Sequence, residues 1–302
     1  MEALKKSFTE HVRNLQIEII EQMKKLDPSI EVEKDLWNRK DKNGDDGGGG
    51  ITCALRGDIF ENAGVNTSIV HGLMDPSFGK QILRESNVEG EEKEYRMWAS
   101  GISLILHPRN PRVPTVHANF RMIQVNEKFW FGGGADLTPY FPHEEDFRHF
   151  HGVWKKACGD EYQKMKDVCD NYFVNKHRNN EMRGVGGIFF DHLNSGDTES
   201  DFEKVVGLSN HFIESYFPIA EKRIHEEFTP EDEDFQLHRR GRYVEFNLLH
   251  DRGTTFGLKT NGRTDSILIS LPARCKFSYA YKPPIGSVHE KMMENYFPKS
   301  WS

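Results

Sequence analysis

Three polar side chains that could do chemistry alternate with apolar ones along residues 116–122. They are His117, Asn119 and Arg121. In a β-strand successive side chains point to opposite faces, so these three would share one face. An imidazole, an amide and a permanent cation on one face could move a proton and bind an anion. The opposite, apolar face would consist of Val116, Ala118, Phe120 and Met122.

The approach to this strand contains three prolines. Pro108, Pro111 and Pro114 fix φ and cannot donate a backbone hydrogen bond. We therefore expect residues 107–115 to form a stiff, ordered connection. An isolated pattern of this polar kind is more often a solvated strand face, but the stiff approach favours a site in which the three side chains are held still.

Arginines recur in turns or on strands beside Gly, Pro or Asn. Guanidinium groups on a rigid scaffold can each bind a carboxylate through two hydrogen bonds, so such a set suits a ligand with several carboxylates. The alternative for each arginine is a surface salt bridge, which must hold for some of them. The set comprises Arg109, Arg112, Arg121, Arg183, Arg252 and Arg263.

Carboxylates and aromatic residues accompany these cations. Asp136 and Asp251 lie near the same turns, although Asp136 could simply cap a turn. Together with the neighbouring rings they predict a wide pocket with apolar walls and a charged rim. The rings are those of Phe129, Trp130, Phe131 and Tyr243.

Four histidines in ordered-looking segments could in principle converge on a metal ion. Their spacing matches no compact metal-binding motif, so core or hydrogen-bonded histidines are the favoured interpretation and we expect no metal or other cofactor. If a divalent metal were bound, its ligands would be His107, His117, His151 and His177.

The whole chain narrows the class of protein. It has 302 residues and a formal net charge of −7, which argues against a generic nucleic-acid binder. Four cysteines without a CxxC pair indicate reduced thiols. Neither a targeting segment nor an apolar run of membrane-spanning length is present, so we expect a cytoplasmic protein without an integral membrane segment.

The sequence patterns of the helices and strands that must position these residues predict an α+β fold. We expect a single domain over residues 1–302, with a large, mainly antiparallel β-sheet covered by helices. An amphipathic helix is expected over residues 1–28, and residues 31–50 are expected to end in a glycine-rich flexible loop at 40–50. An acidic connector is expected at 85–94. Further helices are expected at 144–159, 160–177 and 199–227. Strands are expected at 51–56, 66–71, 102–107, 116–125, 128–131, 183–191, 241–249, 255–258, 266–271 and 276–281, the last four as an antiparallel meander.

Five segments closely resemble the oxygen-dependent coproporphyrinogen III oxidases, and the similarity is collinear from about residue 47 to 281. They are residues 103–121 (SLILHPRNPRVPTVHANFR), 130–141 (WFGGGADLTPYF), 177–193 (HRNNEMRGVGGIFFDHL), 239–258 (RRGRYVEFNLLHDRGTTFGL) and 262–272 (GRTDSILISLP). The resemblance implies a flat antiparallel sheet sandwiched between helices, in a homodimer. It also implies oxidative decarboxylation of the ring A and B propionates of coproporphyrinogen III to vinyl groups. The products would be protoporphyrinogen IX, CO2 and H2O2, with O2 as co-substrate.

The same resemblance implies roles for individual residues. His117 matches the family's proposed acid/base histidine, Asp251 and Arg252 its active-site pair, and Asp136 a further pocket aspartate. Substrate contacts fall on Ser103, Asn119, Phe120, Arg121, Asn261, Gly262 and Arg263, and we add Arg183 from the arginine set. Dimer contacts match residues 66–72 and the last strands.

Two departures from the family pattern are modest. His192 follows Asp191 where relatives often have a second Asp, and Met182 precedes Arg183 where another Arg is common. We expect Asp251 to bind or deprotonate pyrrole N–H groups and His117 to move a proton, although these two roles could be exchanged. Arg121 and Arg252 would orient propionates. A tetrapyrrole carrier and a metal-dependent oxygenase are the alternative functions.

Overall fold

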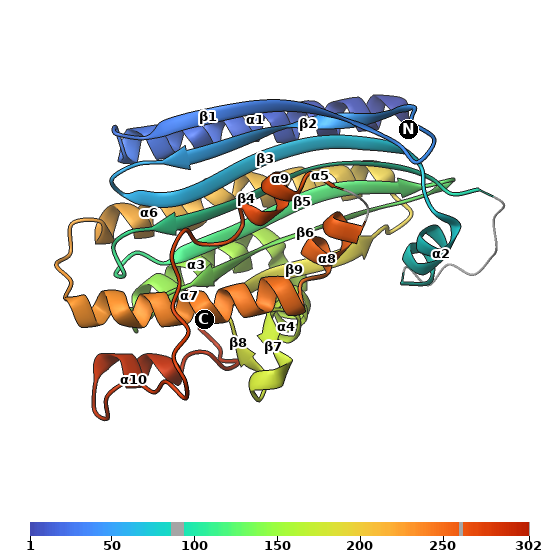
Figure 1. The fold of residues 1–302 in the computed structure, drawn as a ribbon. Coiled ribbons are helices and arrows are strands. Elements are labelled where there is room, and N and C mark those ends of the chain that lie inside the picture. The colour runs from blue at the N-terminus through green and yellow to red at the C-terminus, as the bar shows by residue number, and fades with distance from the viewer. Residues whose placement is uncertain (86–93, 260–261, 302) are drawn as a thin grey trace.

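A seven-stranded antiparallel sheet forms the centre of the molecule (Figure 1). The computed structural model describes residues 1–85, 94–259 and 262–301. Six strands follow one another as a meander, and the seventh joins after two helices, which gives the order β1-β2-β3-β4-β5-β6-β9. The strands are β1 (Glu31–Lys40), β2 (Asp46–Arg56), β3 (Phe60–Leu73), β4 (Arg96–Pro108), β5 (Thr115–Val125), β6 (Lys128–Thr138) and β9 (Gly186–Leu193).

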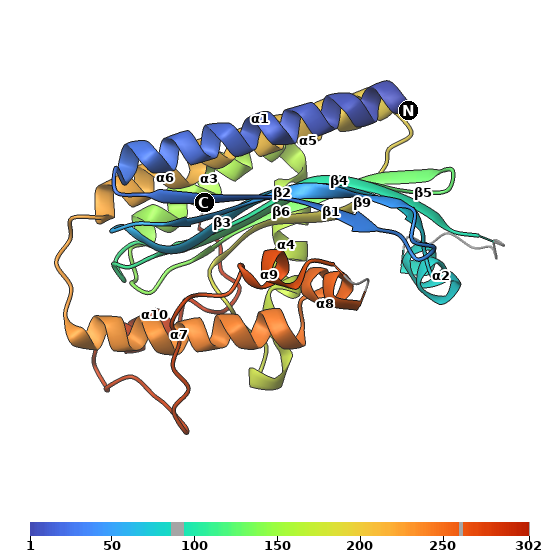
Figure 2. The same cartoon turned by 45° about the horizontal axis from the view of Figure 1, so that its top comes forward.

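One face of the sheet is covered by helices and holds the main core (Figure 2). They are α1 (Glu2–Leu26), α3 (Glu144–Cys158), α5 (Thr198–Asn210) and α6 (Phe212–Arg223). The side chains that α1 buries recur every three or four residues, the period of one helix face: Phe8, Val12, Leu15, Ile19 and Met23. The sheet contributes the apolar face of β5, which was predicted from the alternation and is buried here.

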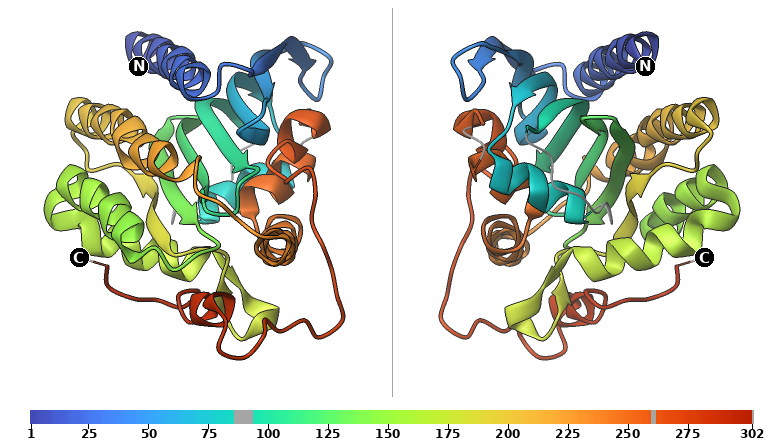
Figure 3. Two further views of the ribbon diagram at one scale, coloured as in Figure 1. Left: turned by 90° about the vertical axis from the view of Figure 1, so that its left-hand side faces the viewer. Right: turned by 90° about the vertical axis from the view of Figure 1, so that its right-hand side faces the viewer.

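The opposite face of the sheet carries a different set of helices, which frame the site (Figure 3). The helices α7 (Pro230–Leu249), α8 (Arg252–Lys259) and α9 (Thr264–Leu268) lie over it. The helix α4 (Tyr162–Tyr172) packs along the edge strand β9. The remaining elements are α2 (Pro76–Glu85), α10 (Val288–Met293) and the two-stranded β7 (Val174–Asn175) and β8 (Glu181–Met182).

The α+β class, the antiparallel sheet and its two helical layers confirm the sequence-based prediction, as does the N-terminal helix. No helix among the described residues is long and apolar enough to cross a membrane. The predicted acidic connector falls on residues 86–93 for most of its length, outside the described residues.

The prediction of a flexible loop over residues 40–50 was wrong. Residues 31–40 and 46–56 form two paired strands, and only a short turn separates them. The glycines serve close packing: a Cβ at Gly50 would lie 2.5 Å from Cζ2 of Trp37 on the neighbouring strand. The Trp37 indole also donates a hydrogen bond from Nε1 to Thr52 Oγ1, at 3.1 Å. The glycine run therefore lets a large ring lie on the sheet.

The prediction of strands in the last third was also wrong. Residues 241–249 belong to α7, residues 255–258 to α8, residues 266–268 to α9, and residues 276–281 are irregular. A helix-start pattern lies twelve residues upstream of Gly241, where Thr229 and Asp232 form a capping box around Pro230. The segment therefore begins as a helix rather than a strand. From there Phe235, Arg239, Tyr243 and Phe246 are buried at helical spacing.

Candidate active site

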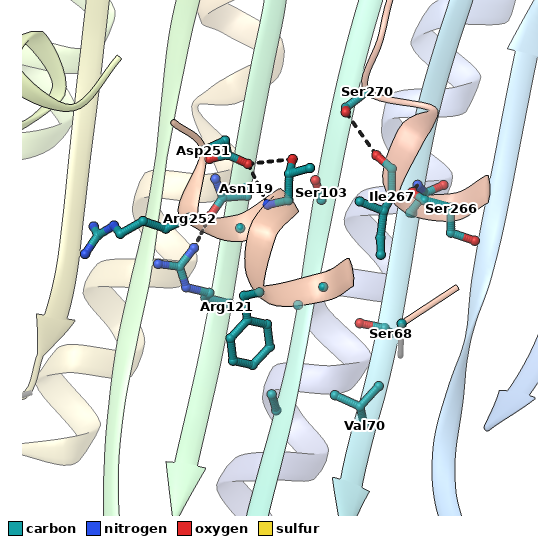
Figure 4. A pocket seen from close by; sticks show the side chains of 18 of the residues that line it. Ser68, Val70, Ser103, Asn119, Arg121, Asp251, Arg252, Ser266, Ile267 and Ser270 are labelled. Atoms are coloured by element: carbon teal, nitrogen blue, oxygen red, sulfur yellow. Dashed lines mark hydrogen bonds between the residues drawn. The ribbon is translucent and has the colours of Figure 1, made fainter. Parts of the chain in front are cut away.

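A cavity of about 910 Å³ lies between the free face of the sheet and the helices α7, α8 and α9 (Figure 4). This volume is at the upper end of the range for small-molecule sites. Strands β1 to β6 and β9 provide its floor, the end of α4 provides one wall, and the C-terminal helices provide the cover. The site thus combines segments far apart in the sequence.

Residues that pair across neighbouring strands form four rows on this face of the sheet. Neighbouring rows are about 7 Å apart, because they are separated by two residues along each strand. The histidine row is Gly64, Ile105, His117 and Asp136. The amide row is Asn66, Ser103, Asn119 and Gly134. The arginine row is Ser68, Gly101, Arg121 and Gly132. The apolar row is Val70, Ala99, Ile123 and Trp130. Small residues dominate the two middle rows, which leaves a flat central floor.

His117 is held by a buried carboxylate. Its Nδ1 lies 2.9 Å from Asp136 Oδ1, and Asp136 is 1% exposed. Burial alone would raise the pKa of Asp136, but the Arg183 guanidinium and the His117 hydrogen bond outweigh it and lower the pKa to about 2. Because the ionised carboxylate can only accept, Nδ1 of His117 carries the proton. In neutral His117 the lone pair then lies on Nε2, which Asn119 Nδ2 approaches to 3.5 Å on the pocket side.

Arg183 binds the Asp136 carboxylate of this pair. Its Nε and NH2 donate to the two oxygens of Asp136 at 2.8 and 2.7 Å. Its NH1 donates to Asn247 Oδ1 at 2.8 Å. The guanidinium, 2% exposed, lies 4.2 Å from the Phe173 ring centroid and 4.4 Å from that of Tyr243. Each of its three nitrogens therefore donates within the protein, so Arg183 supports Asp136, and it also lines the cavity.

Asp251 is both the residue preceding α8 and a pocket carboxylate. Its Oδ2 accepts from the backbone N–H and the hydroxyl of Thr254, at 2.7 and 2.8 Å, as a helix N-cap does. Its Oδ1 accepts from the Tyr172 hydroxyl at 2.8 Å. Burial raises the pKa of Asp251, but these donors outweigh it and hold the pKa below its ordinary value. Asp251 is consequently ionised at neutral pH and weakly basic.

Two arginines meet at one carboxylate on the edge strand. Arg121 NH2 and Arg252 NH2 lie 3.2 and 3.7 Å from Asp191 Oδ2. Arg121 also donates to Asn119 Oδ1 at 3.0 Å. Gly132 makes this geometry possible, since a Cβ there would lie 2.8 Å from Asp191 Oδ1 and 3.0 Å from Arg121 Nε. With two cations and one anion, the cluster keeps a net positive charge for an anionic ligand.

The other predicted substrate residues have different positions. Ser103, Gly262 and Arg263 line the cavity, with Arg263 paired to Asp35 of β1. The Phe120 side chain does not reach the cavity, because it belongs to the opposite face of β5 and is 1% exposed in the core. Asn261 lies outside the described residues. Figure 4 shows Ser103, Asn119, Arg121, Asp251 and Arg252 around one part of the pocket.

The four predicted alternative metal ligands have separate partners. His107 lies 3.2 Å from Thr115 Oγ1 and 3.0 Å from the Ser270 carbonyl. His151 lies 2.8 Å from the Tyr162 hydroxyl and 3.0 Å from the Val185 carbonyl. His177 contacts Glu245 and His250, and His117 contacts Asp136. Within the ranges that the structure describes, no three His, Cys, Asp or Glu side chains are grouped as metal ligands would be.

Burial keeps two of these histidines neutral. It lowers the pKa of His107 to about 3, with nearby Arg240 acting in the same direction. It also lowers the pKa of His151 to about 3, with a contribution from Lys166. Both rings are therefore satisfied, uncharged core groups.

Sequence reasoning missed several residues of the site. The sequence analysis singled out neither Tyr172 nor Trp37, and it named Asp191 only beside a departure from a family pattern. The spacing of Asp251 and Thr254 could have indicated a helix N-cap, because Asp at N-cap and a donor three residues later is a helix-start pattern. No sequence signal pairs Tyr172 with Asp251, which are 79 residues apart.

Comparison with known proteins agrees with the geometry. A model of the family described as coproporphyrinogen III oxidase matches residues 7–301. A protein of Prochlorococcus marinus named oxygen-dependent coproporphyrinogen-III oxidase is 42% identical over 98% of this chain and 91% of its own length. Coproporphyrinogen-III oxidase 1, chloroplastic, of Arabidopsis thaliana is 40% identical over 97% of this chain and 78% of its own length. The matches span both the floor and the cover of the cavity, so the chain belongs to the coproporphyrinogen III oxidase family.

Proposed function

We propose that this protein converts the ring A and ring B propionates of coproporphyrinogen III to vinyl groups, with O2 as electron acceptor. For each propionate the balance is R–CH2–CH2–COOH + O2 → R–CH=CH2 + CO2 + H2O2. The observation that carries the proposal is the flat central floor, with the His117–Asp136 pair at one side and the Arg121–Arg252–Asp191 cluster at the other. A large macrocycle can lie on such a floor and present carboxylates to the cations.

The arginine cluster orients the substrate. Each guanidinium at Asp191 has donors left for a second carboxylate, and Arg263 lines the same cavity from the segment between α8 and α9. Asp251, held ionised by Tyr172 and Thr254, accepts hydrogen bonds from pyrrole N–H groups and stabilises positive charge on the macrocycle as electrons pass to O2.

The geometry favours His117 over Asp251 as the base. Asp251 already accepts three hydrogen bonds and has a lowered pKa, so it binds a proton weakly. His117 has a fixed tautomer whose Nε2 lone pair has only the 3.5 Å contact with Asn119 Nδ2, and Asp136 stabilises the imidazolium that forms when His117 takes a proton. We infer that His117 removes the proton and that Asp251 binds the macrocycle.

The assembly state and location are also proposals. The family resemblance supports a homodimer, which sedimentation of the purified protein would test. A cytoplasmic location is tested by fractionation of the source cells, since the Arabidopsis relative is named chloroplastic.

The experiment is aerobic conversion of coproporphyrinogen III by the purified protein, with product fluorescence read after oxidation. An anaerobic arm and an arm with a strong chelator accompany it. Oxygen-dependent turnover supports the proposal, and His117→Gln should then abolish most of it while Asp251→Asn weakens substrate binding. Tight binding without turnover in any arm would instead indicate a tetrapyrrole carrier, and turnover lost on chelation and restored by metal would indicate a metal-dependent oxygenase.

A further inference from the structure

The apolar row of the floor forms part of an apolar end of the cavity. Six residues line the cavity and also belong to a hydrophobic cluster separate from the main core: Val70, Ile82, Met97, Ile123, Trp130 and Phe256. They come from β3, α2, β4, β5, β6 and α8. Figure 4 shows Val70 well away from Asp251, toward the other end of the strands. We call this set the apolar end.

The apolar end lies directly beside the cationic cluster. Ile123 is two residues beyond Arg121 on the same face of β5, and Trp130 is two residues before Gly132 on β6, so the row is about 7 Å from the arginine row. Phe256 is one helical turn beyond Arg252 on α8. One substituent of a bound macrocycle can therefore reach the arginines while a neighbouring substituent reaches the apolar end.

Charged residues border the apolar end but do not belong to it. The charged lining residues nearest in register to Val70 are Arg39 and Lys40 at the end of β1 and Asp41 in the turn that follows it. His192 borders the apolar end through a ring contact with Trp130, with centroids 5.3 Å apart. A carboxylate placed against the six side chains of the apolar end would lose part of its hydration, whereas an uncharged alkyl or vinyl group would gain apolar contact there.

We propose that the apolar end is the subsite for the vinyl group made in the first decarboxylation. This inference rests on the proposed function. Among the described residues a single His117–Asp136 pair faces the cavity, so two propionates must be processed in turn and the macrocycle must be reseated between them. Reseating replaces a carboxylate by a vinyl group in one position, and the apolar end holds that group while the second propionate reaches the arginines.

Val70→Thr tests the subsite, because the two side chains have nearly the same shape and the hydroxyl adds only polarity. Val125→Thr is the matched control: Val125 belongs to the same hydrophobic cluster and is fully buried, but it does not line the cavity. Binding of two oxidised porphyrins is measured by fluorescence quenching, one with four propionates and one with two propionates and two vinyls. We expect Val70→Thr to weaken the divinyl porphyrin about tenfold more than the tetrapropionate porphyrin, and Val125→Thr to weaken both equally.

A time course of turnover, in which the released monovinyl intermediate is measured, supplies the second readout. With Val70→Thr, a larger fraction of the monovinyl intermediate should leave the enzyme before the second step than with wild type or Val125→Thr. Equal weakening of both porphyrins by Val70→Thr, or an unchanged intermediate fraction, would overturn the subsite. Failure of the wild-type protein to convert the substrate would overturn the proposed function instead, so the two failures are distinguishable.

Discussion

Asp136→Asn removes one negative charge from between His117 and Arg183 while keeping the shape of the side chain. In the wild type the carboxylate accepts one hydrogen bond from His117 and two from Arg183. Asparagine leaves the guanidinium of Arg183, which is 2% exposed, without its counter-charge. Breaking a buried pair on one side costs about 3–5 kcal/mol of unfolding free energy at pH 7.

Part of this loss depends on pH, and its sign can be worked out. The pKa of Asp136 is about 2 in the folded protein against an ordinary 3.8, a difference of about 1.8 units at 1.36 kcal/mol each, or about 2 kcal/mol. Because the folded pKa is the lower one, this contribution is full well above pH 4 and is lost as the pH falls through 3.8 toward 2. The gap in stability between wild type and Asp136→Asn should therefore narrow by about 1 kcal/mol between pH 7 and pH 3, and by about 2 kcal/mol once the pH is below 2.

Urea unfolding followed by tryptophan fluorescence at pH 7, 5, 4 and 3 measures the gap. Both proteins share His107 and His151, so the titration of these two histidines cancels in the difference, which reports on Asp136 and its partners His117 and Arg183. Adding Arg183→Met to Asp136→Asn should recover stability, because the stranded charge is gone. A gap below about 1 kcal/mol at pH 7, or one that stays constant down to pH 3, would refute the reasoning. In turnover, the variant should lose about 10²- to 10⁴-fold in kcat, the range of general acid–base catalysis.

Three further outcomes are expected. Gly132→Ala should raise KM about tenfold or more with little change in Tm, because the new Cβ would lie 2.8 Å from Asp191 Oδ1 and displace the arginine cluster. Steady-state kinetics and a thermal melt check this, and an unchanged KM would contradict it. Tyr172→Phe removes a donor to Asp251 and so raises the pKa of that carboxylate; the acid limb of the profile of kcat/KM against pH should move to higher pH, and a limb that stays in place would count against the assignment. His107 has a pKa of about 3 in the folded protein, against 6.5 in the unfolded chain, so only the unfolded chain takes up a proton between these pH values and stability falls with decreasing pH. His107→Gln should flatten the dependence of the unfolding free energy on pH below pH 6 by about 1.4 kcal/mol per pH unit, measured by urea unfolding. An unaltered slope would refute this prediction.

Local periodicity was enough to predict the parts of the fold that depend on one element. The 3.6-residue period of α1 and the alternation of β5 were recognisable because each element buries one face. The same alternation correctly predicted that His117, Asn119 and Arg121 would share a face. Helix α7 was missed because its aromatic and apolar residues also suit a strand, and the capping box at Thr229 decided between the two.

The pairings that build the site could not be predicted from the sequence, because they join distant segments. Arg183 reaches Asp136 across 47 residues, and Tyr172 reaches Asp251 across 79. The arginine set suggested a polycarboxylate ligand, but burial divides its members: Arg121, Arg183 and Arg252 all line the cavity, and the buried Arg183 is also bound to the Asp136 carboxylate. Phe120 followed from a matching motif, yet strand alternation directs its side chain into the core.

All strands of the cavity floor except β9 are complete at residue 138, whereas its cover begins with α7 at residue 230. During synthesis at about 5–20 residues per second, the apolar end would therefore be open to water for several seconds before α8 emerges. A nascent chain in this interval has His117 but neither Asp251 nor Arg252. Ligand capture by a growing polypeptide is thus delayed until nearly the whole chain has left the ribosome.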